Sequence, residues 1–189
     1  MAVTFEDAIS ALTEIMRRHI ARGMTPPGSV VVVGGTALAA HAIRPQSDDM
    51  DMYAEGLVDD IVIEVEKALK GRFGAAFKID ATAGENLWGD ILIRDIGSSP
   101  IVRNIHVGGV IIHVRALTVE DLFLLKLAAG RDKDTQDLPS LAHKIDLDRT
   151  IDRLGQFVKW HGNRAAIPAF ADAFLTAVGA YKNADKATI

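Results

Sequence analysis

Cysteine is absent from this chain of 189 residues. The protein therefore has no disulfide, no thiolate nucleophile and no zinc site built on thiolates, which is compatible with a reducing cytoplasm. No segment reaches the ~20 consecutive apolar residues that a transmembrane helix requires. The N-terminus also lacks the basic stretch and apolar run that are typical of a secretory signal. We therefore expect a soluble, cytoplasmic protein that does not bind membranes.

A generally basic surface is also missing, because the formal net charge is -4. This charge disfavours broad nucleic-acid affinity, although a local basic patch can still bind RNA. The six histidines are scattered, and no two of them have a metal-ligand spacing such as that of HExxH. Hydrophobic residues make up 49% of the chain and charged residues 24%. This composition supports one domain, or a compact core with a small extension.

The segment from Val30 to Tyr53 carries the strongest pattern and reads VVVVGGTALAAHAIRPQSDDMDMY. Its four consecutive valines cannot form one face of an amphipathic helix, and they favour a short strand buried on both faces. Gly34 and Gly35 allow a sharp turn with uncovered backbone amides, and good helix formers follow from Thr36. A bare turn that leads into a helix can bind phosphate.

Asp49 and Asp51 lie two residues apart in the next predicted strand. Alternation places Met50 and Met52 on one face of this strand and the two carboxylates on the other. Such a pair can hold a divalent cation such as Mg²⁺, because water and substrate phosphate complete the coordination.

Each half of the pattern, the glycine pair and the DxD, also has an ordinary interpretation. A lone DxD occurs at solvated strand ends, and a GG turn occurs in dinucleotide-binding folds, but the last glycine of GxGxxG is missing here.

Together, the glycine pair and the DxD resemble the signature of the DNA polymerase β-like nucleotidyltransferase superfamily. The fuller pattern is similar to the branch that contains AbiEii-type toxin nucleotidyltransferases and related bacterial proteins, and it comprises Gly34-Gly35-Thr36-Ala37-Leu38, Arg44, Ser47, Asp49 and Asp51. The resemblance covers about Val30 to Leu138. It implies metal binding by Asp49 and Asp51, and nucleotide binding by Gly34, Gly35, Thr36, Arg44 and Ser47.

The superfamily typically takes a third metal-binding carboxylate from a strand that follows the DxD strand. The resemblance favours Asp90, because Gly89-Asp90-Ile91-Leu92 is similar to an apolar-Asp-apolar-apolar element of these relatives. Asp95 and Asp80 are alternatives. Asp90 and Asp95 have opposite parity along a regular strand, so they cannot both face one site. Asp90 can also be an ordinary polar residue at the start of a strand.

Residues 118–129 predict a buried helix that is capped by Thr118 and contains Lys126 as its only basic residue. A buried ammonium needs an acidic side chain or a bound phosphate. The related families carry a catalytic or nucleotide-contacting lysine in an EDL...K helix, and Lys126 matches that position; a purely structural pair with a carboxylate is the alternative. The charged segment that follows also resembles those families, and we expect it to orient the lysine or the substrate through Arg131, Lys133, Asp134 and Asp137.

The remaining pattern predicts helices over residues 5–20 and 57–73 and from residue 146 onward, strands over 77–80 and 87–96, and a hairpin of strands 101–107 and 110–115. We expect an α/β (α+β) fold, in which helices pack on a small mixed sheet. The predicted nucleotidyltransferase-like core spans residues 1–140. A C-terminal helical extension, residues 141–189, is expected to pack on this core.

The resemblance implies transfer of a nucleoside monophosphate from an NTP to an acceptor hydroxyl, with Mg²⁺ or Mn²⁺ as cofactor. The implied catalytic residues are Asp49, Asp51, Asp90 and Lys126. The acceptor would be an RNA such as tRNA or a protein, and the chain would be the toxin of a toxin–antitoxin pair with a cognate antitoxin as its partner. The alternative is a catalytically degenerate module of the same fold that binds a nucleotide or a partner protein.

Overall fold

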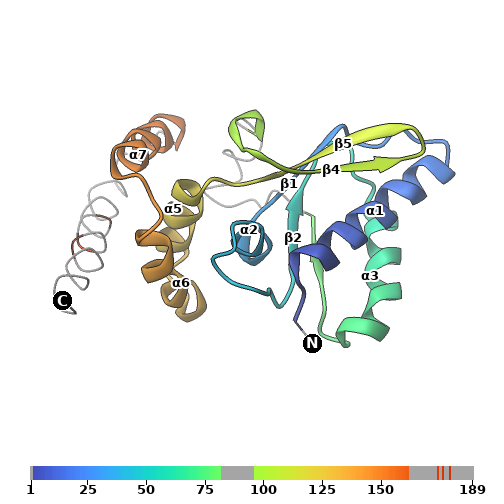
Figure 1. The fold of residues 1–189 in the computed structure, drawn as a ribbon, viewed down its shortest axis with the longest axis horizontal. Helices are drawn as coiled ribbons and strands as arrows, with labels where there is room; N and C mark the ends of the chain where they lie inside the picture. The colour runs from blue at the N-terminus through green and yellow to red at the C-terminus, as the bar shows by residue number, and fades with distance from the viewer. Residues whose placement is uncertain (1, 82–95, 162–173, 175, 177–178, 180–189) are drawn as a thin grey trace. The chain divides into compact units, whose positions relative to one another are not determined.

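The computed structural model describes residues 2–81, 96–161, 174, 176 and 179. Its sheet is mixed and five-stranded, in the order β3-β2-β1-β5-β4, with helices packed on it (Figure 1). This arrangement confirms the predicted α/β fold class. No helix among the residues described is long and apolar enough to cross a membrane.

The chain forms two compact units. The described part of the first unit comprises residues 2–81 and 96–117 and contains the sheet, and that of the second comprises residues 118–161, 174, 176 and 179 and is helical. Among the described residues, the division falls between Leu117 and Thr118; the core of residues 1–140 and the C-terminal extension stay predictions. The helix that carries Lys126 therefore belongs to the second unit.

The centre of the sheet is β1 (Ser29–Val32), where Val30, Val31 and Val32 are completely buried, as the valine run predicted. β1 is parallel to β5 (Val110–Ala116) and antiparallel to β2 (Met50–Tyr53). β3 (Ile79–Asp80) extends the sheet beyond β2 in parallel, and β4 (Ile101–Val107) pairs antiparallel with β5. The predicted hairpin is confirmed, since Gly108 and Gly109 join β4 to β5 with φ of 56° and 80°.

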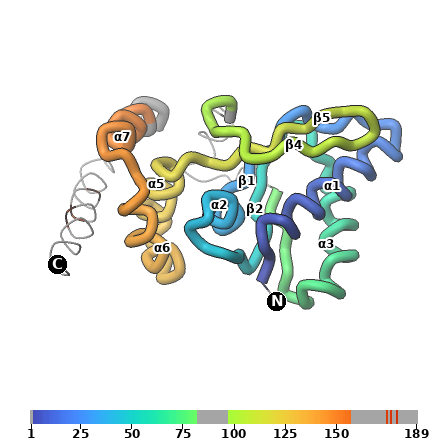
Figure 2. Tube along the Cα trace, viewed as in Figure 1, coloured from blue at the N-terminus to red at the C-terminus, as the bar shows by residue number. Residues whose placement is uncertain are grey.

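Three helices complete the first unit: α1 (Phe5–Ala21), α2 (Gly34–Ala40) and α3 (Asp59–Phe73). α1 begins with a capping box, in which Thr4 Oγ1 accepts the amide of Asp7 and the Asp7 carboxylate accepts the amide of Thr4. α1 and α3 lie side by side and contact the sheet (Figures 1 and 2). A short 3-10 turn, Ile96–Ser98, precedes β4.

The described helices of the second unit are α5 (Val119–Ala129), α6 (Asp132–Ala142) and α7 (Leu147–His161). Thr118 caps α5 as predicted, because its side chain accepts the amide of Asp121 at 3.1 Å. Arg153 of α7 donates two hydrogen bonds to the Asp121 carboxylate, at 2.6 and 3.0 Å, and so links α7 to α5.

Candidate functional site

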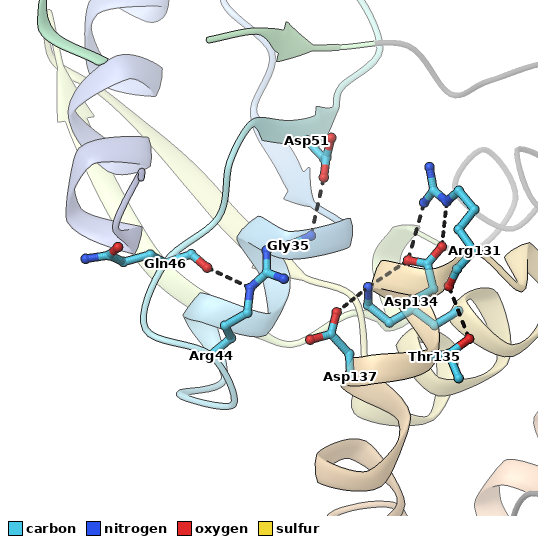
Figure 3. Close-up of polar contacts among 9 residues, drawn as sticks. Gly35, Arg44, Gln46, Asp51, Arg131, Asp134, Thr135 and Asp137 are labelled. Atoms are coloured by element: carbon cyan, nitrogen blue, oxygen red, sulfur yellow. Dashed lines mark hydrogen bonds and ion pairs between the residues drawn. The ribbon is translucent and has the colours of Figure 1, made fainter. Parts of the chain in front are cut away.

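The glycine turn predicted from the sequence lies against the second aspartate of the DxD pattern. Gly34 has φ +50°, and a Cβ added to it would lie only 2.2 Å from Asp51 Oδ2, so no side chain fits there. The same carboxylate oxygen accepts the amide of Gly35 at 3.3 Å (Figure 3). The two halves of the pattern therefore meet within the first unit.

Ser47 and Arg44 occupy the space beside the second glycine. A Cβ added to Gly35 would lie 2.2 Å from Ser47 Oγ and 2.9 Å from Arg44 Nη2. Two backbone hydrogen bonds between Ser47 and Val3, of 2.7 and 2.8 Å, hold the segment that carries Ser47 in place. Arg44 Nε donates to the carbonyl of Gln46 at 2.7 Å (Figure 3). The hydroxyl and the guanidinium therefore lie against the backbone of Gly35, which is buried.

Thr36 connects α2 to the DxD segment rather than exposing its hydroxyl. Thr36 Oγ1 accepts the amide of Asp51 at 3.0 Å and donates to the carbonyl of Asp49 at 3.4 Å. The side chain is buried, with 2% of the residue exposed. Thr36 therefore holds the backbone of both aspartates, and the nucleotide contact that the resemblance implies for it stays a prediction.

Burial alternates along the segment that carries the DxD pattern. Met50 and Met52 are completely buried, and Asp49 and Asp51 are half-buried, which confirms the predicted alternation. Asp49 directly precedes β2, and Asp51 lies within it. Carboxylate oxygens are the donors that Mg²⁺ and Mn²⁺ prefer, so these two partly exposed side chains fit a divalent cation.

Of the three candidates for the third carboxylate, only Asp80 lies within the described residues. Asp90 and Asp95 lie outside the described residues. Asp80, the remaining alternative, pairs in register with Asp51 on the neighbouring strand and is exposed. Within the described ranges, no three His, Cys, Asp or Glu side chains come together as metal ligands.

Four of the predicted charged residues of the second unit, Lys126, Arg131, Asp134 and Asp137, form a compact network between α5 and α6 (Figure 3). Lys126 Nζ lies 2.9 Å from Asp134 Oδ1 and 2.7 Å from Asp137 Oδ2. Only 10% of the lysine side chain is exposed, against 2% for Asp134 and 11% for Asp137. Asp134 and Asp137 of α6 are therefore the acidic partners of the buried Lys126 ammonium. A pair of this kind is what the purely structural interpretation of Lys126 expects.

Arg131 contributes a second cation to this network. Its Nε lies 2.5 Å from Asp134 Oδ2, and its side chain is 63% exposed. Burial raises the pKa of Asp134, but the hydrogen bonds from Arg131 and Lys126 outweigh this effect and hold that pKa below its ordinary value. Lys133, the remaining residue of the predicted set, is exposed on α6.

Sequence reasoning did not assign two residues that hold the site together. Val3 fixes the segment that carries Ser47, and the carbonyl of Gln46 orients Arg44. Both act through backbone groups, which every residue type other than proline provides alike, so side-chain patterns contain no signal for them.

Residues 8–174 match the model of a protein family described as "Nucleotidyltransferase of unknown function (DUF6036)". The matched range includes the glycine turn, the DxD pattern and Lys126. Neither a search of curated proteins nor a search of solved structures found a match. The family match supports the expected reaction class, whereas the AbiEii-type branch stays a prediction. Since the match spans most of its length, the chain belongs to this family of nucleotidyltransferases, DUF6036.

Proposed function

We propose that the protein transfers a nucleoside monophosphate from an NTP to an acceptor hydroxyl, with Mg²⁺ or Mn²⁺ held by Asp49 and Asp51. Membership of a nucleotidyltransferase family supports the class of reaction. The contact of Asp51 with the glycine turn supports the site most directly, because its carboxylate lies against Gly34 and accepts the amide of Gly35. This contact brings a cation-binding group to the glycine turn, where the proposal places the phosphates.

In the proposed reaction, the acceptor oxygen forms a bond to the α-phosphorus of the NTP. The bond from that phosphorus to the oxygen that bridges to the β-phosphate breaks, and pyrophosphate leaves with the electron pair. The acceptor proton passes to a base, for which the resemblance suggests Asp90. A bound cation would neutralise charge on the phosphates.

The chain's own groups would bind and orient the nucleotide. We assign the phosphates to the turn at Gly34 and Gly35, with Ser47 Oγ and the Arg44 guanidinium beside it. Lys126 stays a proposed phosphate contact by resemblance, although its two carboxylate partners also support a structural role in the second unit. We further propose, on the resemblance alone, an acceptor on RNA such as tRNA or on a protein, and a toxin role with an antitoxin partner.

The test uses the purified chain with each NTP labelled on its α-phosphate, Mg²⁺ or Mn²⁺, and total cellular RNA and protein. We expect label in a macromolecule, and its loss in Asp49→Asn and Asp51→Asn. Asp48→Asn is the matched control, because Asp48 is an exposed neighbour outside the proposed site. No labelling with any NTP, or labelling that survives Asp49→Asn, would contradict the proposal.

A catalytically degenerate nucleotidyltransferase-fold module is the second candidate. Two observations favour it: within the described ranges no three His, Cys, Asp or Glu side chains come together as metal ligands, and the amide of Gly35 is already bonded to Asp51. Titration calorimetry with each NTP, with and without Mn²⁺, separates the candidates. The enzyme requires metal-dependent NTP affinity, and the degenerate module should show none.

A further inference from the structure

We propose that His41 is a positioning residue that holds the peptide group at which the second unit begins, and so narrows the directions in which α5 can leave the sheet. Its imidazole Nε2 lies 2.6 Å from the carbonyl oxygen of Leu117, 76 residues further along the chain. Leu117 is the last residue of the first unit, and Thr118 begins the described part of the second. The proposal concerns this joint and does not depend on nucleotidyl transfer.

The chemistry of the contact fixes which atom donates. A carbonyl oxygen can only accept, so Nε2 of His41 carries the proton and donates it to Leu117. The neutral tautomer with its proton on Nε2 and the doubly protonated ring both offer this donor. The bond therefore acts as a permanent tie rather than as a switch that depends on the charge of the ring.

Both ends of this tie are anchored within the first unit. His41 ends α2, where its amide donates to the carbonyl of Ala37 at 3.0 Å, and Thr36 fastens the same helix to the DxD backbone. At the other end, the amide of Leu117 donates to the carbonyl of Val32, the last residue of β1, at 3.1 Å. The imidazole therefore connects a fixed helix to the fixed end of the sheet.

The carbonyl that His41 holds belongs to the peptide group between Leu117 and Thr118. This group is planar, so a bond to its oxygen restricts the orientation of the whole plane. Thr118 then starts α5, because its side chain accepts the amide of Asp121 at 3.1 Å and its carbonyl accepts the amide of Leu122 at 3.0 Å. His41 therefore acts on the first turn of α5 through the backbone, although it contacts only the first unit.

Burial explains why this bond is not easily replaced. Leu117 is only 2% exposed, so bulk water has little access to its carbonyl. A buried carbonyl that loses its donor is costly. It can regain a partner only if the peptide plane rotates or the joint opens to water. Either change moves the start of α5, so loss of the His41 donor should widen the range of orientations of the second unit.

The first measurement is the distribution of distances between spin labels on the two units. The chain has no cysteine, so two introduced cysteines are its only thiols. Ile63→Cys on α3 and Ile151→Cys on α7 suit this purpose, because both isoleucines are 46% exposed and lie in different units. We expect His41→Leu to broaden the distribution measured by double electron–electron resonance. A distribution of unchanged width would overturn the proposal.

The second measurement is hydrogen exchange at the start of α5. The amide of Leu122 bonds to the carbonyl of Thr118, so it reports on the first turn of this helix. In His41→Leu this amide should exchange roughly tenfold faster or more, as expected when a buried hydrogen bond beside it is lost. Exchange at the rate of the wild type would contradict the assigned role.

Three further variants separate the hydrogen bond from packing. His41→Gln keeps a nitrogen donor near the position of Nε2 and should restore the narrow distribution and the slow exchange, whereas His41→Leu keeps only the bulk. His106→Leu is the matched control, because His106 is exposed on β4 and takes the same chemical change. If thermal unfolding shows that His41→Leu does not fold, His41→Asn replaces it, because its shorter amide places no donor there. Equal behaviour of His41→Gln and the variant without the donor would overturn the proposal.

Discussion

Gly34 and Asp51 occupy a volume that has room for only one side chain. An added Cβ at Gly34 would lie 2.2 Å from Asp51 Oδ2 and 3.0 Å from Asp51 Cγ. The backbone of Gly34 is also left-handed, with φ +50°, which costs any residue with a Cβ free energy. Glycine is therefore required both by conformation and by the carboxylate that lies against it.

We predict that Gly34→Ala lowers the free energy of unfolding by roughly 2–4 kcal/mol, because left-handed strain and steric overlap add. Urea denaturation measures this loss. Gly56→Ala is the matched control, because Gly56 has φ +81° and nothing within 4 Å of its added Cβ. It should lose only the strain, about 1–2 kcal/mol. Equal losses in the two variants would show that Asp51 does not restrict the space at Gly34.

His19 is a second residue whose environment restricts it, because it is completely buried on α1. The amide of Val58, which precedes α3, donates to His19 Nε2 at 3.4 Å, and Nδ1 has no partner among the described residues. Burial and the nearby charge of Arg22 lower the pKa of His19. The folded protein therefore holds this imidazole neutral.

Because the folded pKa of His19 lies below the unfolded value, the unfolded chain binds the proton more readily. Well above the unfolded pKa of about 6.5, His19 is neutral in both states and its titration does not change the free energy of unfolding. Below that pH the unfolded chain takes up the proton first, so the free energy of unfolding falls. We predict that His19→Gln, which does not titrate, loses less stability than the wild type between about pH 7 and pH 5. Urea denaturation across this range measures the difference. Parallel pH profiles would contradict the assigned neutral state.

At the scale of elements, α5 and α6 are joined by the network of Lys126, Asp134, Asp137 and Arg131. Three of these side chains are nearly buried, and the ammonium stands between two carboxylates. Removal of one partner from a buried ion pair leaves a charge with neither solvent nor a counter-ion. The association of the two helices should therefore depend on Lys126.

We predict that Lys126→Met lowers the free energy of unfolding by roughly 3–5 kcal/mol at neutral pH. The loss should shrink in acid. The lowered pKa of Asp134 means that its stabilisation is present above the unfolded pKa of about 3.9 and disappears as the pH falls through the folded pKa. Lys133→Met is the control, since Lys133 is exposed on α6 and takes the same chemical change. A stable Lys126→Met variant that fails to bind NTP would instead favour a direct nucleotide contact.

At the scale of the whole molecule, the candidate site draws on segments that are distant in the sequence. The glycine turn follows β1, the DxD pattern enters β2, and Ser47 is held by Val3 near the N-terminus. The register of β2 and β3 adds Asp80 beside Asp51. Asp80 therefore competes with Asp90, which resemblance favours, for the role of third carboxylate.

We predict that Asp90→Asn lowers the rate of nucleotidyl transfer roughly 100-fold or more, as expected for loss of a general base, with little change in NTP affinity. Asp80→Asn should retain most of the rate. Single-turnover assays with labelled NTP compare the two variants, and Asp95→Asn tests the remaining alternative. The reverse order of effects would assign the role to Asp80, the register partner of Asp51.

Local patterns predicted the elements well, and contacts poorly. Four valines, two glycine pairs and a threonine before a helix each produced the expected strand, turns or cap, because these preferences act over a few residues. The partner of Lys126 was only one of several possibilities, since a buried ammonium can pair with any acidic group that the fold brings near. The strand expected over residues 87–96, with Asp90 and Asp95, lies almost wholly outside the described residues.

The sequence by itself determined the fold class, and its motifs indicated the reaction class that the family match supports. The tertiary structure decided that Asp51 bonds Gly35, that Thr36 holds the DxD backbone, and which carboxylates neutralise Lys126. The physical reason is the separation along the chain over which each kind of interaction acts. Periodicity and turn chemistry are local, whereas these contacts depend on how the sheet order and the packing of helices bring distant segments together.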